Sequence, residues 1–598
     1  MPLPPLPVPS LEHTLLALDR AATALARPED PEELGRVERF RQNLAAFQRG
    51  DGPRLQEALE EHAAHERPLE RAWFGDEWKN IYFAGRESLP LTTNVSFGLN
   101  LAEESEDPIR AVATTIHRIV SVHLAYLRGQ YPAQVNNRGQ ALDVGQLKVL
   151  AGGVRHPRTG RDGFRSATAS SMGREVGIIV AGRLFAVTVS DAQGYPAGVD
   201  SLTATVRRLL DHDSVHHRAD DTLGFTEMSY LGSATLAPVL EGFHEQPGNA
   251  ATYARLTDLL CTVTITDDGE QGLAERLRTV LLRPGLAWVY KPISYQLDLA
   301  GGAPAIHMEH SMYDGGCVAE IVHQLQSVQV PSDKADIEAA NTAAGPSGAG
   351  DSALPVDELT WDLTDELTSS IRDGLRAYRE QAARFRAVEV VLPRIPQEEL
   401  PFRMSGDGLS QTVLSIAQLL AYGRVRSVYE AVDMRTFLGG RTEIMRPATL
   451  EAVTFARSLV AGEATEEQFE DLLDAHRRWV KACKAGNGLN RHLLALHHMS
   501  KEHHGEPAEF FRSPTLRMLQ TDFLSTTSLG LPSQITGYTF EPTDPEGFGI
   551  AYTPQSASIT YLISYVEGGT DDPQSFLDAL PRAGVLLHDF VKGLQPRP

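Results

Sequence analysis

The pattern of apolar and polar positions along the chain changes several times between helical and strand spacing. Residues 11–70 are rich in Ala, Leu and Glu and predict helices. Apolar runs at residues 176–180 and 184–189, separated by Ala-Gly-Arg, predict a hairpin of two buried strands. A further short strand is expected at residues 286–290. Helices and strands therefore alternate through the first half of the chain.

The second half of the chain continues this alternation. Residues 335–352 consist mainly of Ala, Gly, Ser and Pro and predict a linker or a mobile loop. Strands are expected at residues 387–392, 549–552 and 558–563, and a long helix after the capping-box pattern Thr465-Glu-Glu-Gln468. The alternation predicts an α/β fold. Because 598 residues are too many for one hydrophobic core, we expect two large domains.

Composition and charge argue against several classes of protein. The net charge of -23 disfavours a nucleic-acid-binding surface, which needs clustered Lys and Arg. The most apolar segment, residues 176–189, is too short to span a membrane, and the first residues lack the order of a signal peptide. Three scattered cysteines, Cys261, Cys317 and Cys483, give no disulfide framework. We therefore expect a cytoplasmic protein with no nucleic-acid or membrane partner.

Metal sites and serine-hydrolase sites are also disfavoured. His212 and His216 are four positions apart, and histidine pairs occur at residues 497–498 and 503–504. No carboxylate or cysteine completes a metal signature such as H-E-x-x-H, so we expect no bound metal. The chain contains no G-x-S-x-G motif, which lowers the case for a serine hydrolase.

The strongest catalytic candidate is His310 in the sequence Glu-His-Ser-Met-Tyr-Asp-Gly. Imidazole can take and return a proton near neutral pH, and Asp314, four residues later, can hold the ring in place. After Asp314 the apolar residues recur at helical spacing and predict a helix at residues 318–328. His310 would then lie just before a buried helix, as a general base. A core histidine at a helix entry is the alternative.

Two other places carry polar groups that a reaction could use. Residues 525–528 form the hydroxyl cluster Ser-Thr-Thr-Ser, which can donate hydrogen bonds to a developing oxyanion or can simply form a turn. Arg491 lies in an apolar helical neighbourhood, where its charge is costly unless an anion pairs with it. An internal salt bridge would satisfy Arg491 equally well.

Together these motifs resemble the choline/carnitine O-acyltransferase family over nearly the whole chain. The order and spacing of the motifs carry the resemblance. They are Leu6-Pro-Val-Pro-Ser-Leu-Glu-His-Thr-Leu15, Leu89-Pro-Leu-Thr-Thr-Asn94, Val180-Ala-Gly-Arg-Leu-Phe185, Glu309-His310-Ser311 with Asp314, Gly440-Arg-Thr-Glu-Ile-Met-Arg446 and Leu524-Ser-Thr-Thr527. Each motif alone is weak evidence.

The resemblance implies two α/β domains of the chloramphenicol acetyltransferase-like kind, with the active site in a tunnel between them. Residues 95–350 would form the domain with the catalytic histidine, and residues 1–94 and 351–598 the domain with the acceptor pocket. His310 would deprotonate an acceptor hydroxyl, which attacks a thioester carbonyl directly, without an acyl-enzyme. Ser525 and Thr527 would hydrogen-bond the intermediate or the acceptor. The family usually has Ser at the position of Thr527.

The acceptor can be inferred from charge, because carnitine carries a carboxylate that choline lacks. Carnitine enzymes of the family surround this carboxylate with a cation, a tyrosine and a threonine. The spacings of Tyr429, Thr442 and Arg491 are similar to those of carnitine enzymes, and Glu443 belongs to the same segment. Ile444 stands where a second Thr is expected, so a different hydroxylated acid remains an alternative acceptor.

The acyl pocket is inferred from residues 537–542, Gly-Tyr-Thr-Phe-Glu-Pro. Aligned by the proline on the family's Phe-Gly-Pro segment, Tyr538 takes the place of the bulky residue that blocks the acyl channel in short-chain members. A shift of one position would put Gly537 there and reverse the conclusion. Phe540 is assigned to the substrate site. We expect short-chain donors.

The donor is less clearly indicated. Family members that use coenzyme A carry a lysine pair before the pocket tyrosine, whereas this chain has Pro396 and Leu400 there. Arg394 and Arg403 could substitute, and Asp407 is assigned to the same site. Alternatively, the donor is a phosphopantetheine arm on an acyl carrier protein, which has no 3'-phosphate. We expect no resident cofactor, with acyl-CoA or acyl-phosphopantetheine as co-substrate.

The sequence therefore predicts an O-acyltransferase that uses a thioester donor and carnitine or a carnitine-like acid. One alternative is an acyl-carrier-protein-dependent transferase in a polyketide or other natural-product pathway. Another is a non-catalytic binding protein of the same fold.

Overall fold

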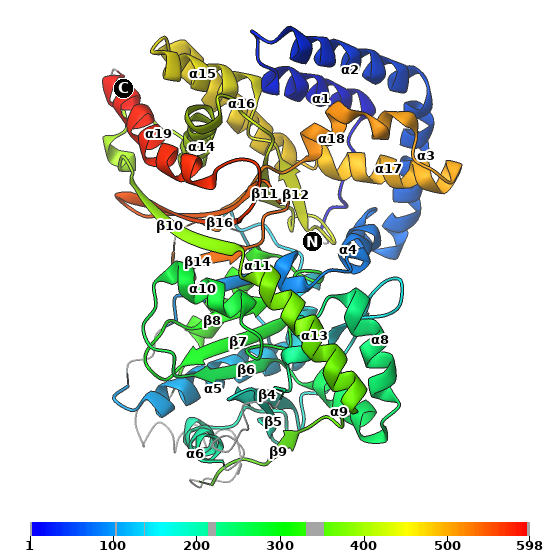
Figure 1. Cartoon of the computed structure of the whole chain (residues 1–598), viewed down its shortest axis with the longest axis vertical. Helices are drawn as coiled ribbons and strands as arrows, with labels where there is room; N and C mark the ends of the chain where they lie inside the picture. The colour runs from blue at the N-terminus through cyan, green and yellow to red at the C-terminus, as the bar shows by residue number, and fades with distance from the viewer. Residues whose placement is uncertain are drawn as a thin grey trace.

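The computed structural model describes residues 3–101, 105–136, 138–212, 223–330, 352–530 and 532–594. These residues form two lobes, each with a β-sheet and helices packed against it (Figure 1). The predicted α/β fold with two domains is therefore confirmed. Residues 335–351 of the expected linker lie outside the described residues.

The first sheet has eight strands within the described residues. In spatial order they are β14 (Ile535–Phe540), β1 (Val95–Leu99), β8 (Ala305–Met308), β7 (Ile293–Asp298), β6 (Thr262–Thr266), β4 (Glu175–Val180), β5 (Arg183–Thr188) and β9 (Val356–Leu359). A separate hairpin consists of β2 (Val154–His156) and β3 (Gly163–Arg165). The predicted hairpin β4–β5 is confirmed, with Ala181 and Gly182 in the left-handed conformation that its tight turn needs.

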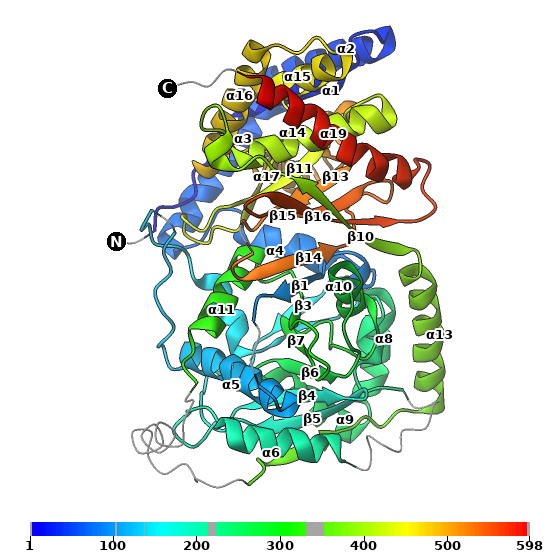
Figure 2. The same cartoon turned by 90° about the vertical axis from the view of Figure 1, so that its left-hand side faces the viewer.

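Helices cover both faces of the first sheet. Those of this lobe are α5 (Pro108–Leu127), α6 (Val199–Leu210), α8 (Ser233–His244), α9 (Pro247–Asp258), α10 (Leu273–Leu282), α11 (Gly315–Ser327) and α13 (Asp365–Ala382). Figure 2 shows α5 and α11 on one side of the sheet and α8 and α13 on the other. The two faces have separate hydrophobic cores, as expected for a sheet buried on both sides.

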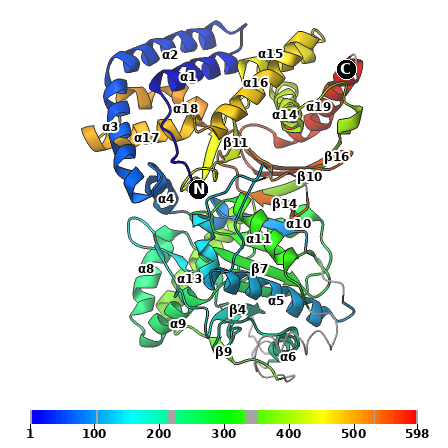
Figure 3. The same ribbon diagram turned by 180° about the vertical axis from the view of Figure 1, so that it is seen from behind.

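The second sheet has six strands within the described residues, and most of the remaining helices lie on one face of it (Figure 3). Its strands, in spatial order, are β10 (Phe385–Pro393), β16 (Ser558–Val566), β15 (Phe548–Pro554), β13 (Leu524–Thr527), β11 (Val428–Asp433) and β12 (Thr442–Met445). The helices are α1 (Leu11–Leu25), α2 (Pro31–Arg49), α3 (Asp51–Glu66), α4 (Gly75–Ala84), α14 (Gly406–Tyr422), α15 (Leu450–Ala461), α16 (Glu466–Lys484), α17 (Asn490–His504), α18 (Pro514–Gln520) and α19 (Pro573–Gly593). Short 3₁₀ helices lie at Arg67–Leu69, Leu89–Leu91, Gly145–Ala151, Glu227–Tyr230, Gln397–Glu399 and Glu509–Arg512.

Local sequence signals fix several of these boundaries. The capping box of α16 is complete, since Thr465 and Gln468 each accept a hydrogen bond from the backbone N–H of the other. Asp314 is the N-cap of α11, which spans Gly315–Ser327 and so begins three residues before the helix predicted at residues 318–328. The strands predicted at residues 387–392, 549–552 and 558–563 are confirmed as parts of β10, β15 and β16.

The strand predicted at residues 286–290 is wrong. This segment is an irregular, fully buried connection between α10 and β7. Its backbone groups bond to loops and side chains: Val289 receives the amide of Asn94 at its carbonyl and donates its N–H to Ser229 Oγ. The apolar run therefore reflects burial rather than strand pairing.

Both edges of the first sheet are formed by strands that come late in the chain. At one edge β14 pairs with β1, with Tyr538 opposite Phe97 and Gly537 opposite Gly98. At the other edge β9 pairs with β5, and α13 follows it into the first lobe's core. Helices α1 to α4 pack in the second lobe. The first sheet therefore takes one strand, β14, from the part of the chain that follows α13. The domain bounds near residues 95 and 350 stay predictions.

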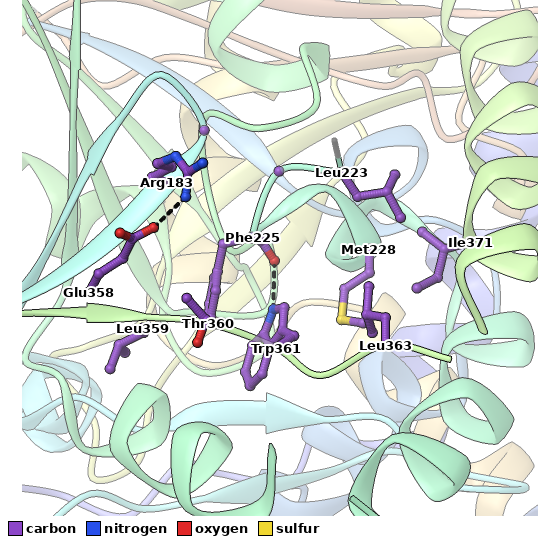
Figure 4. A pocket seen from close by; sticks show the side chains of 12 residues that line it. Arg183, Leu223, Phe225, Met228, Glu358, Leu359, Thr360, Trp361, Leu363 and Ile371 are labelled. Atoms are coloured by element: carbon purple, nitrogen blue, oxygen red, sulfur yellow. Dashed lines mark hydrogen bonds and ion pairs between the residues drawn. The ribbon is translucent and has the colours of Figure 1, made fainter. Parts of the chain in front are cut away.

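A cavity of about 150 Å³ lies near the β9 edge of the first sheet (Figure 4). Phe225 and Trp361 stack in its wall with ring centroids 4.0 Å apart, and the ion pair between Arg183 and Glu358 lies at one side. Its lining contains none of the residues that the sequence assigns to catalysis or binding.

Candidate active site

His310 lies just after β8, where it touches residues of both lobes. Its side chain is 26% exposed, and Nδ1 lies 3.7 Å from Asp314 Oδ1. Nδ1 is buried and has no hydrogen-bond partner within the described residues. Nε2 is therefore the ring nitrogen that remains accessible to a substrate.

The surroundings of His310 favour its neutral form. Burial lowers the pKa of His310 below its ordinary value of 6.5, and the charge of Arg441 acts in the same direction. The carboxylate of Asp314 opposes both effects but does not reverse them. A neutral imidazole with a free Nε2 is the state that a general base requires.

Arg441 holds the turn that carries His310. Its Nε lies 3.1 and 3.0 Å from the two carboxylate oxygens of Asp314, and its Nη2 lies 2.7 Å from Oδ1. The same guanidinium donates to the carbonyls of Ser311 at 2.7 Å and His310 at 3.0 Å. Arg441 precedes β12 in the second lobe, so this ion pair joins the two lobes at His310.

Asp314 stays ionised although its side chain is only 14% exposed. Burial raises its pKa, but the charge and hydrogen bonds of Arg441, His310 and the hydroxyl of Thr442 together bring it below the ordinary value of 3.8. Arg441 lies in the motif at residues 440–446, but its residue type alone predicts no role for it. The sequence signal for a role of Arg441 was its charge directly before Thr442, a predicted acceptor residue.

Helix α4 supplies two aromatic residues that sequence analysis missed. The ring of Tyr82 stacks on His310 with centroids 5.4 Å apart and planes at 24°. Trp78 lies under the guanidinium of Arg491, 4.9 Å from ring centroid to Cζ. The two aromatic residues are four positions apart, which places them on one face of the helix. This spacing was the only sequence signal.

The hydroxyl motif forms the short central strand β13. Ser525 lies beside Tyr429 of the parallel strand β11 and is buried. Side chains alternate along a strand, so Ser525 and Thr527 share one face while Thr526 faces the helices behind. Burial raises the pKa of Tyr429 well above its ordinary value, and Tyr82 and Asp314 add smaller electrostatic contributions. The face of β13 that carries Ser525 is therefore the one turned toward Tyr82 and Asp314, the neighbours of His310.

The acceptor residues inferred from sequence form one connected group. The side chain of Thr442 helps to lower the pKa of Asp314, and the Thr442 carbonyl accepts a hydrogen bond from Arg491 Nη2. Glu443 is buried, and its Oε1 accepts the backbone N–H groups of Ile444 at 2.9 Å and Arg491 at 3.2 Å. Burial raises the pKa of Glu443, against the opposing charge of Arg491.

Arg491 has unused hydrogen-bond donors although it is only 2% exposed. Its Nη2 binds the Thr442 carbonyl, but Nε and Nη1 have no partner within the described residues. Burial lowers the pKa of Arg491, while the charges of Glu443 and Asp314 oppose this. The internal salt bridge considered as an alternative is not found in the described part of the chain. Buried unpaired donors of a charged group are costly unless an acceptor satisfies them.

Tyr538 and Gly537, the two alternatives for the position that blocks the acyl channel, lie on opposite faces of β14. The Tyr538 ring stacks on Phe97 with centroids 5.2 Å apart, and its hydroxyl donates to Thr527 Oγ1 at 3.3 Å. A Cβ at Gly537 would lie 2.4 Å from Leu562 Cδ1, in the packing on the other face. Phe540 stacks with Tyr538, with centroids 6.5 Å apart. Tyr538 and Phe540, but not Gly537, therefore share a face with the hydroxyl motif.

The donor candidates lie at the N-terminal end of α14. Asp407 accepts the hydroxyl of Tyr552 and lies 2.9 Å from His476 Nε2. Burial raises its pKa, but the hydrogen bond and charge of His476 lower it below the ordinary value. Arg394 approaches Gly406 at this end and donates Nη1 to the Gln555 carbonyl at 2.8 Å. Arg403 is exposed nearby in sequence.

Metal sites and membrane spans were also sought in the described residues. No group of three His, Cys, Asp or Glu side chains there is arranged to hold a metal ion. His216, named above as a possible ligand, lies outside the described residues. No helix in the described ranges combines the length and the apolar character that a membrane crossing needs.

The chain matches the choline/carnitine O-acyltransferase family over residues 6–582, and it belongs to this family. It is 23% identical to carnitine O-palmitoyltransferase 2, mitochondrial, of Bos taurus, over 99% of this chain and 92% of that one. It is also 23% identical to choline O-acetyltransferase of Rattus norvegicus, over 99% and 93%. Among solved structures, the trichothecene 15-O-acetyltransferase of Fusarium sporotrichioides is 12% identical, with a TM-score of 0.37 over 85% of this chain and 94% of that one.

These matches confirm the resemblance inferred from the motifs. Membership of the family makes the chain an acyltransferase that acts on a hydroxyl. The roles of the individual site residues, and the tunnel expected between the lobes, stay predictions.

Proposed function

We propose that this protein transfers an acyl group from a thioester to the hydroxyl of carnitine or a carnitine-like acid, with His310 as general base. Nε2 of His310 takes the hydroxyl proton, and the alkoxide attacks the thioester carbonyl directly. Ser525 and Thr527 donate hydrogen bonds to the tetrahedral intermediate. When the carbon–sulfur bond breaks, His310 returns the proton to the thiolate. The ester and the free thiol are the products.

Arg491 is the observation that carries the choice of acceptor. Its two unpaired donors are buried beside Thr442, and the side chain of Thr442 lowers the pKa of Asp314, which lies next to His310. A carboxylate offers two oxygens that a guanidinium binds with good geometry. Carnitine and related hydroxy acids carry this group, whereas choline does not. We therefore favour a carboxylate-bearing acceptor.

Arg491→Asn is expected to weaken the use of carnitine about ten- to a hundredfold in kcat/KM, because a charge-assisted hydrogen bond contributes about 1.5–3 kcal/mol. Choline, which lacks the carboxylate, should be affected much less. Initial rates with both acceptors measure the difference. Arg478→Asn, on the exposed face of α16, is the matched control. Equal losses with both acceptors would remove Arg491 from carboxylate recognition.

The donor is proposed to be an acyl-CoA, with an acyl carrier protein as second candidate. The second candidate is supported by Pro396 and Leu400, which stand where family members that use coenzyme A have lysines. Arg394 and Asp407 at the N-terminal end of α14 are the proposed donor contacts. Comparing acyl-CoA, its 3'-dephospho form and an acyl-loaded carrier protein tests the choice. Loss of rate without the 3'-phosphate supports coenzyme A, and a preference for the carrier protein supports the second candidate.

Acetyl to butyryl donors are expected to react faster than octanoyl donors, because the ring of Tyr538 occupies space beside Thr527. Overpacking costs roughly 1–3 kcal/mol, more than the approximately 0.8 kcal/mol gained from each buried methylene. Tyr538→Gly should therefore raise the octanoyl rate selectively. Tyr538→Phe keeps the ring and should leave the chain-length preference unchanged. A wild-type enzyme that is fastest with octanoyl or longer donors would show that Tyr538 does not block the channel.

A further inference from the structure

A buried cluster of polar side chains lies behind the hydroxyl motif, on the face of the second sheet that α14 covers. It consists of Glu430 on β11, Thr526 on β13, Tyr552 on β15, and Gln411 and Asp407 on α14. Glu430 is 5% exposed and forms no ion pair with any cation among the described residues. A buried carboxyl group without a cation needs another explanation.

The contacts of Glu430 converge on one oxygen atom. Its Oε2 lies 2.6 Å from Thr526 Oγ1 and 3.0 Å from the hydroxyl of Tyr552, and it accepts from Gln411 Nε2. Thr526 Oγ1 also lies 2.6 Å from the backbone carbonyl of Tyr429. Glu430 therefore bonds to the strand of the hydroxyl motif at its central residue.

Counting hydrogens assigns a proton to Glu430. Tyr552 has one hydroxyl hydrogen, and it is committed to Asp407 Oδ1, which lies closer than Glu430. The hydroxyl of Thr526 has one hydrogen too, and the Tyr429 carbonyl accepts it. The 2.6 Å contact between Glu430 Oε2 and Thr526 Oγ1 then requires a hydrogen on Glu430 itself.

The charges around the cluster agree with this count. Asp407 is kept ionised by His476 on α16, and Lys484 of the same helix adds a weaker positive charge. A second carboxylate beside Asp407 would be repelled. Burial raises the pKa of Glu430 well above its ordinary value, and the charge of Asp407 raises it further.

We propose that Glu430 is a proton-bearing positioning residue that fixes strand β13, and thus the hydroxyls of Ser525 and Thr527, by its hydrogen bond to Thr526. The proposal rests on the proposed function in so far as these two hydroxyls serve the reaction. Ser525 and Thr527 lie on the opposite face of the same four-residue strand. A strand shift of about 1 Å at such a place can cost a hundredfold in rate. Within the cluster, Tyr552 links Glu430 to Asp407, which is also a proposed donor residue.

Activity of three single variants and one double variant tests the positioning role. Glu430→Gln is neutral and of the same shape, so it should keep kcat within about threefold of wild type. Glu430→Met cannot bond to Thr526 and should lower kcat roughly ten- to a hundredfold. Thr526→Val should lower kcat similarly, and the double variant Glu430→Met with Thr526→Val should be no worse than either single variant. Independent, multiplying losses, or an inactive Glu430→Gln, would overturn the proposal.

Stability against pH tests the proton separately from activity. A carboxyl whose pKa is raised on folding contributes stability that is lost as pH rises above its unfolded value of 4.5. The Tm of Glu430→Gln relative to wild type should therefore increase as pH rises from 5 to 8. Glu389→Gln, an exposed position on β10, makes the same charge change and should show no such trend. If the Tm difference between Glu430→Gln and wild type does not change with pH, Glu430 does not carry the proposed proton. If wild type transfers no acyl group, the proposed function fails, while this stability test remains valid.

Discussion

His310→Ala is expected to lower kcat by about 10²–10⁴-fold, the contribution of a general base, while thermal unfolding stays close to that of wild type. The fold should tolerate the change because Nδ1 makes no hydrogen bond within the described residues and the ring mainly stacks on Tyr82. Steady-state rates and thermal unfolding measure the two effects. His323→Ala, an exposed histidine on α11, is the matched control.

The pH profile adds a second test of the same residue. Because burial lowers the pKa of His310, the fall in kcat/KM on the acid side should lie below the ordinary histidine value of 6.5. Near-normal turnover by His310→Ala would remove this residue from the mechanism. If wild type binds acceptor and donor but shows no turnover, the non-catalytic binding protein is favoured instead.

Arg441→Met is expected to destabilise the protein by about 3–5 kcal/mol, because it leaves the carboxylate of Asp314, whose side chain is only 14% exposed, without its cation. Catalysis should also fall, since Arg441 holds the carbonyl of His310. Urea unfolding gives the stability, and kinetics on the folded fraction gives the rate. Adding Asp314→Asn to Arg441→Met removes the unpaired charge and should restore much of the stability, but not the rate.

The pH dependence of stability has a definite sign for this pair. In wild type the pKa of Asp314 is lowered on folding, so its contribution is present above the ordinary value of 3.8 and is lost as pH falls through the folded value. Without Arg441, burial alone raises that pKa, and the variant should lose stability as pH rises. A variant as stable as wild type at neutral pH would mean that the ion pair contributes little.

Periodicity and turn chemistry predicted most of the elements near the site. The hairpin β4–β5 and the strands β15 and β16 follow from apolar runs bounded by turns, because local pattern and burial agree there. They disagree at residues 286–290, where the apolar side chains are buried although the backbone is irregular. A single sequence does not distinguish these two situations.

The candidate site was predictable where chemistry is concentrated in short motifs. His310 with Asp314, and Ser525 with Thr527, stand out because their residue types and order imply a reaction. Tyr82, Arg441 and Glu430 gain their importance from contacts across more than eighty positions of sequence or from strand neighbours, and no local pattern marks such contacts.

The pairing of β14 with β1 at the edge of the first sheet ties the two lobes together. Five residue pairs join β14 to β1, and Tyr538 and Phe540 on this strand face the proposed reaction space. Separating the two lobes would break the backbone hydrogen bonds between β14 and β1. We therefore expect substrates to enter and leave by movements of side chains rather than by opening of the two lobes. If the first lobe were produced alone, β1 would become an unpaired edge that invites other chains to pair with it. The first lobe therefore completes its sheet only with residues 535–540, which the chain supplies after most strands of the second sheet.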